Sequence, residues 1–278
     1  MSLDVAATVS LLWPAMVAGM LVTVTHVPLG MQVIGRGIVF IDLAIAQIAG
    51  LGVILADALG WEPQGAAMQV AALSAALCSA LLLTWTERRW PEVQEAIIGV
   101  TFVLASSAAL LLLAGNPHGG EHLKDLLIGQ ILWVNPGRLP IDAVVYGIII
   151  AVWFGLGERI GRTGFYALFA CAVTVSVQLV GLYLVFATLV IPALASFYVK
   201  RRRLPKAYAI GVLGYAVGLA VSGVADLPSG PMIVCARAAV GPSAASSYPF
   251  LSPRAAAWNR VHCNSPAVRS FPKGSAPD

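Results

Sequence analysis

The feature that most constrains this chain is a series of long apolar runs separated by short polar breaks. The runs are 5–25, 37–59, 66–86, 96–114, 140–157, 163–199 and 207–225. A helix needs about 20 consecutive apolar residues to cross a bilayer, and several of these runs meet that length. The chain is therefore expected to cross a membrane repeatedly.

Composition supports the same expectation. Of the residues, 59% are hydrophobic and 11% are charged, whereas a soluble domain has about 25% charged residues. The alternating pattern of a transmembrane barrel is missing, so helices are the structures expected to cross the lipid. The N-terminus lacks the positive flank of a cleavable signal, so the first run is expected to stay in place. The predicted fold class is all-α, a polytopic transmembrane helical bundle.

Positive charge is distributed unevenly among the polar breaks. One set of breaks holds Arg36, Arg88 with Arg89, positions 159 and 162, and the segment KRRRLPK from Lys200 to Lys206. Because cytoplasmic loops carry the Lys/Arg excess, this set is predicted to lie inside and the N-terminus outside. Net charge is +4, and no nucleic-acid partner is expected.

The run 163–199 conflicts with a single crossing. Cytoplasmic charge flanks both of its ends, and one helix of that length would be about 55 Å long against a core of about 30 Å. We expect a broken or re-entrant helix with its break near Val180 to Val185, where Gly181 can turn the chain. The alternative is one strongly tilted helix with a proline kink.

Two other segments depart from the spanning pattern. Residues 122–134 are too short and too polar at their start for an ordinary span, and they favour an interfacial or re-entrant helix on the outer side. Beyond about Ala236 the chain is rich in Ser, Pro and Arg without periodicity, so it is expected to be disordered. We predict a transmembrane domain over 1–235 and a tail over 236–278, natural or resulting from a changed reading frame.

Several stretches together resemble one family. The segment MQVIGRGIVFIDLAIAQIAGLGV resembles the second helix of the permeases of metal-ion ABC importers, which take up zinc, manganese or iron. EAIIGVTF, LKDLLIGQILWV and DLPSG are similar to later motifs of that family, and the block from Val180 to Ala195 resembles its Ile-Pro-Ala segment. The resemblance covers about residues 15 to 235.

The resemblance implies a function and a set of partners. The chain would be the permease subunit of an importer of divalent metal ions, in the bacterial inner membrane. It would act as a homodimer surrounded by lipid, receive metal from an extracytoplasmic binding protein, and be driven by a cytoplasmic ABC ATPase. It has no GxxxxGK[ST] loop of its own. We expect no enzyme activity and no permanently bound cofactor, with metal as substrate and ATP on the partner.

Asp42 is the main candidate for the transport pathway. Residues four apart share a helix face, so Asp42, Ala46 and Gly50 form one stripe of small residues that would face the bundle. Relatives usually carry a His four residues after this Asp, but position 46 is Ala, and Gln47 lies about 140° further round the helix. Asp42 is interpreted either as lining the pathway or as a structural hydrogen-bonding partner.

Polar residues elsewhere supply further candidates. Gln178 and Gln130 either line the route with Gln47 or hydrogen-bond between helices. Glu95 is expected to be an acid favoured by the N-terminal dipole of its own helix. On the outer face, a group of His and carboxylate side chains has a spacing that can bind a divalent ion. The alternative is a polar loop that docks the binding protein or is simply solvated. That tentative metal cluster is His118, Glu121, His122 and Asp125.

The resemblance also assigns the ATPase-coupling segment to roughly Thr188 to Arg203, which the charge pattern independently places on the cytoplasmic side. Its candidate residues are Leu189, Ile191, Pro192, Lys200, Arg201 and Arg202.

The rival function is an ion-coupled secondary transporter of a small solute. Apart from Asp42, however, the runs are judged to hold almost no ionisable residue for a relay. The cysteines are far apart and predict neither a disulfide framework nor a zinc cluster, only buried apolar side chains. They are Cys78, Cys171, Cys235 and Cys263.

Overall fold

The described part of the chain is helical throughout. The computed structural model describes residues 5–61, 65–114, 127, 129, 131–197, 199, 202–225 and 227–245. Short 3₁₀ turns at Pro91–Val93, Ile131–Trp133 and Gly157–Ile160 supplement the α-helices. The α-helices are α1 (Val5–Arg36), α2 (Ile41–Ala58), α3 (Ala66–Arg89), α4 (Gln94–Leu113), α6 (Leu139–Leu156), α7 (Gly161–Val180), α8 (Leu182–Ala195), α9 (Arg203–Ala225) and α10 (Ser229–Ala245).

Among these residues, 7 helices are long and apolar enough to cross a membrane. They satisfy their backbone hydrogen bonds internally, which the hydrocarbon core demands of any spanning segment. The predicted all-α polytopic bundle is confirmed.

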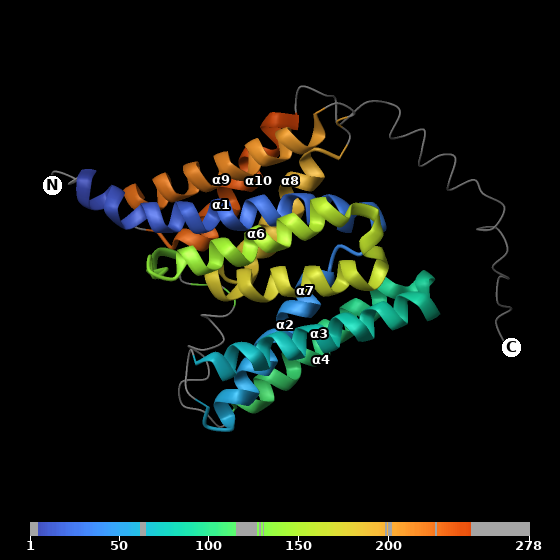
Figure 1. Cartoon of the computed structure of the whole chain (residues 1–278). Helices are drawn as coiled ribbons and strands as arrows, with labels where there is room; N and C mark the ends of the chain where they lie inside the picture. Colours follow the sequence, from blue (N-terminus) through green and yellow to red (C-terminus); the bar gives the residue numbers. More distant parts are fainter. Residues whose placement is uncertain are drawn as a thin grey trace, which may run out of the picture.

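The helices form two groups, with α7 lying between them (Figure 1). In one group α2 packs against α3 and α4, and in the other α8, α9 and α10 pack together. Helix α1 contacts α6, α8 and α9, while α7 contacts α2 and α3. One core cluster runs through both groups, from Ala15 in α1 to Ile233 in α10.

Basic residues from distant parts of the sequence meet at one end of the bundle. The guanidinium of Arg88 donates to the Thr163 hydroxyl at 2.7 Å, and Arg162 lies 3.6 Å from the Glu87 carboxylate. The guanidinium carbon of Arg36 lies 4.2 Å from the centroid of the Phe165 ring. The ends of α1, α3 and α7 therefore share a face, which by the positive-inside rule is cytoplasmic.

The long run 163–199 is broken at Gly181, as predicted. Helix α7 ends at Val180 and α8 begins at Leu182, with Gly181 between them at φ 84° and ψ 160°. That backbone conformation is essentially restricted to glycine. A single tilted helix is thereby excluded. Gly129 packs so closely on the backbone of Val180 and Gly181 that a side chain there would have no space.

Two expectations need correction. Helix α10 continues to Ala245, ten residues beyond the domain boundary placed at 235, and residues 246–278 lie outside the described residues. Burial was expected for the cysteines, but Cys78 and Cys235 are exposed and Cys171 is half-buried. Exposure of Cys78 is tolerated because α3 is long and apolar enough to span, and the surface of a spanning helix faces lipid.

Candidate functional site

Helix α2 places its small-residue face inside the bundle. Asp42, in the first turn, is 0% exposed, Ala46 is 3% exposed, and Gly50 is also buried. Small side chains let α3, α4, α7 and α8 approach this helix closely. The predicted inward direction of the stripe is therefore confirmed.

The Asp42 carboxylate has no hydrogen-bond partner in the part of the chain that the structure describes. Neither of its oxygens bonds to any described residue. By contrast, Asp142 in α6 has the guanidinium of Arg138 at 3.9 Å. Buried polar groups are nearly always paired, so an unpaired carboxylate needs an explanation. The position of Asp42 in the first turn of α2 stabilises a carboxylate, since the N-terminus of a helix carries partial positive charge.

Glu95 tethers the start of α2 from another helix. Its carboxylate accepts a hydrogen bond from the backbone N–H of Phe40 at 3.2 Å. Phe40, the N-cap residue of α2, makes no side-chain cap of its own. Glu95 lies in the first turn of α4, as expected for an acid favoured by the dipole of that helix, and it also caps α2 two residues before Asp42. Because Phe40 and Glu95 lie 55 residues apart, no local sequence pattern predicts their hydrogen bond.

The neighbouring residue, Gln94, holds the end of α3. Its amide donates to the Leu83 carbonyl at 3.0 Å, and the Thr86 hydroxyl donates to its side-chain oxygen at 3.0 Å. The first turn of α4 therefore connects the cytoplasmic ends of α2 and α3.

The other predicted route residues have different surroundings. Gln47 is half-buried on α2, whereas Gln178 is exposed on α7, three residues before the break. The structure therefore does not bring Gln178 to the buried face that carries Asp42. Gln130 lies outside the described residues.

The predicted outer metal cluster also lies outside the described residues, at positions 118, 121, 122 and 125. Within the described ranges there is no group of three or more His, Cys, Asp or Glu side chains that could hold a metal ion.

Asp42 is less isolated as an ionisable residue than the sequence suggested. His26 in α1, Asp142 in α6 and Arg237 in α10 are also buried. Of these three residues only Asp142 lies within the apolar runs, so the expectation of almost no other ionisable residue in the runs has this one buried exception. Asp142 is stabilised by Arg138, so Asp42 remains the buried carboxylate without a described partner.

The end of α8 presents the predicted coupling segment. Leu189 and Pro192 are buried and Ile191 is half-buried, while Leu194 in the last turn is 56% exposed. Arg202 is exposed and takes a left-handed backbone with φ 59°, which turns the chain into α9. Lys200 and Arg201 lie outside the described residues.

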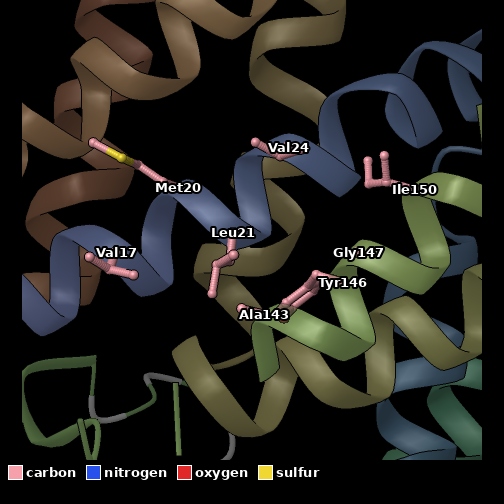
Figure 2. A pocket seen from close by; sticks show the side chains of 8 residues that line it. All are labelled: Val17, Met20, Leu21, Val24, Ala143, Tyr146, Gly147 and Ile150. Atoms are coloured by element: carbon pink, nitrogen blue, oxygen red, sulfur yellow. The ribbon is translucent and has the colours of Figure 1, made fainter. Parts of the chain in front are cut away.

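A cavity of about 250 Å³ opens between α1 and α6 (Figure 2). The Tyr146 hydroxyl beside it is already hydrogen-bonded to Ser176 at 2.7 Å. With an apolar lining, the cavity has no donor set for a metal ion. It is lined by Val17, Met20, Leu21, Val24, Ala143, Tyr146, Gly147 and Ile150.

Comparisons with known proteins agree with this architecture. The chain is 27% identical over 242 residues to the uncharacterized membrane protein slr2045 of Synechocystis, covering 79% of this chain and 84% of that protein. It is 24% identical over 254 residues to the manganese transport system membrane protein MntC of Halalkalibacterium halodurans, covering 83% and 85%.

A solved structure shares the fold. PsaBC from Streptococcus pneumoniae in complex with Fab superposes with a TM-score of 0.70 at 19% identity, covering 90% of this chain and 96% of that chain.

A family model covers nearly the whole described chain. The model of the ABC 3 transport family matches residues 8–160 and 153–241. The resemblance seen in the sequence motifs is thus confirmed at the level of the family. With 7 membrane-crossing helices, the chain is a multi-pass protein of the bacterial inner membrane and belongs to the ABC 3 transport family.

Proposed function

We propose that the chain is the permease subunit of an importer of divalent metal ions and that Asp42 lines its pathway. The observation that carries the proposal is a fully buried carboxylate whose two oxygens have no described partner. Ionisable residues inside a membrane protein usually mark the route of a solute. The structural alternative, a hydrogen-bonding role for Asp42, finds no support because no such bond is present among the described residues.

The chemistry of this face favours a hard ion. Carboxylate and carbonyl oxygens suit Mn²⁺, whereas imidazole is the better ligand for Zn²⁺. Ala46, one turn from Asp42, contributes no donor atom. We therefore propose Mn²⁺ over Zn²⁺ as the preferred substrate, in line with the manganese transport named for the relative in Halalkalibacterium halodurans.

Adding an imidazole should shift this preference. In Ala46→His the new side chain shares the helix face of Asp42, so the ratio of zinc to manganese uptake is expected to rise about tenfold. Radioactive-metal uptake by cells expressing the variant measures the ratio. Ala46→Leu is the matched control, since it adds bulk without a ligand. An unchanged ratio in a well-expressed Ala46→His variant contradicts the oxygen-donor assignment.

Energy would come from a partner. We propose that the chain acts as a homodimer with a cytoplasmic ABC ATPase and an extracytoplasmic metal-binding protein. ATP binding and hydrolysis would move the end of α8, and α8 would pass the movement to α1 and α10, which it contacts. The metal would then meet Asp42 from alternate sides.

Leu194 offers the sharpest test of this coupling, because it is exposed whereas Pro192 is buried. Leu194→Glu should abolish co-purification of the cognate ATPase and lower uptake at least about tenfold, since a charge in an apolar contact is costly. Val93→Glu is the matched control, because Val93 is a similarly exposed apolar residue just before α4. Normal co-purification of the Leu194 variant would place the ATPase elsewhere.

The rival, an ion-coupled secondary transporter, predicts a different result. Its uptake would persist without the ATPase and would collapse when the ion gradient is dissipated. Uptake that needs the ATPase rejects it.

A further inference from the structure

Arg237 in α10 is a buried cation. Its side chain is 0% exposed. The Nη2 group donates to the Thr23 hydroxyl in α1 at 3.3 Å and to the Gly211 carbonyl in α9 at 3.1 Å. Its guanidinium carbon lies 4.1 Å from the centroid of the Tyr215 ring. Three helices therefore surround this charge.

The fold makes space for this side chain. A Cβ atom at Gly214 in α9 would collide with the Arg237 side chain and lie 3.2 Å from its Cα. Arg237 lies about 12 Å along the axis of α10 from its first residue, Ser229. The guanidinium is therefore packed in the interior of the bundle, away from the chain ends of α10.

The hydrogen bonds of Arg237 leave two groups unsatisfied. Nε and Nη1 have no partner among the described residues. The ion pairs among the described residues involve other arginines, Arg138 and Arg162. Arginine stays protonated in proteins, and an uncompensated buried charge is strongly destabilising. Two neutral acceptors and one aromatic face reduce this cost without balancing the charge.

The described residues that contact Arg237 supply no negative charge. His26 lies on the adjacent face of α1, and its Nδ1 is 3.0 Å from the Val22 carbonyl, so a neutral ring would donate there. Its Nε2 has no described partner, and a neutral imidazole carries no charge. The sequence over 246–278 contains one acidic residue, Asp278.

We propose that Arg237 holds a small monovalent anion of the halide class between α1, α9 and α10. The ligand must accept hydrogen bonds, because both unsatisfied groups are donors. It must be negative, because no described residue balances the charge. It must also be small, because the guanidinium is fully enclosed. Chloride meets all three conditions, whereas gluconate is too large.

Thermal unfolding of the full chain in detergent tests the proposal. At equal ionic strength, the wild type should unfold at a Tm about 3 °C or more higher in sodium chloride than in sodium gluconate, because a ligand that binds only the folded state stabilises it. Arg237→Met should lose this difference. Arg138→Met should keep it, since Arg138 has a side chain 48% exposed and pairs with Asp142.

Equal Tm values for the wild type in the two salts would overturn the proposal, as would an equal chloride effect in Arg237→Met. A second measurement covers the case in which Arg237→Met fails to fold. Wild-type crystals grown in bromide should show an anomalous peak in contact with the guanidinium, and absence of that peak rejects the site. Neither readout depends on transport, so the site can fail while the proposed function stands.

Discussion

Asp42→Asn is expected to lower metal uptake at least about tenfold without lowering the amount of protein in the membrane. The substitution keeps the shape of the side chain and removes the charge that would attract a divalent ion. Because the carboxylate has no described partner, its removal leaves no other group unsatisfied. The free energy of unfolding should therefore stay the same or rise, since a buried uncompensated charge is costly.

Uptake of radioactive manganese, normalised to the amount of permease in the membrane, measures this effect. Asp57→Asn is the matched control, because Asp57 lies at the other end of the same helix and is half-buried. The control should retain uptake within about twofold. If Asp42→Asn transports normally, the pathway does not pass Asp42. If it is instead strongly destabilised, Asp42 has a structural role.

Gly30→Val should be the most destabilising of the substitutions considered, with a cost of about 3 kcal/mol or more in the free energy of unfolding. A Cβ atom at Gly30 in α1 would collide with the backbone carbonyl of Leu189 in α8. That atom is backbone in the middle of a helix, so it cannot rotate away. The two helices would have to separate, and the buried side chains around Leu189 would lose their contacts.

Gly35→Ala is the control for this substitution, because Gly35 lies in the same helix with open space around its Cβ position. It should be neutral or stabilise slightly, since alanine favours a helix. Chemical denaturation in detergent measures both variants. Gly30→Val should also reduce co-purification of the ATPase, because α8 carries the proposed coupling segment. Unchanged stability of this variant would contradict the close packing of α1 on α8.

The motifs of the family also carried information that composition lacks. The Ile-Pro-Ala block located α8, and its exposed end at Leu194 was visible only in three dimensions. The missing His at position 46 was evident in the sequence, but its consequence depends on what surrounds Asp42. The metal cluster at residues 118, 121, 122 and 125 stays a prediction, as do the homodimer and the disorder expected over 246–278.

The sequence by itself determined the features that depend on how each segment of the chain partitions between water and lipid and on its local backbone. The apolar runs predicted the spanning helices, the Lys/Arg pattern predicted their direction, and Gly181 marked the break between α7 and α8. Each of these depends on a residue and its chain neighbours, because hydrophobic length, charge and φ are local quantities.

Only the tertiary structure decided which polar groups have partners. It left Asp42 without a partner among the described residues, enclosed Arg237 between three helices, turned Gln178 to the surface, and brought Glu95 to the backbone of Phe40. Apolar periodicity cannot predict such pairings, because lipid-facing and bundle-facing sides of a spanning helix are similarly apolar. Which side faces the bundle is set by close packing between helices that lie far apart in the sequence.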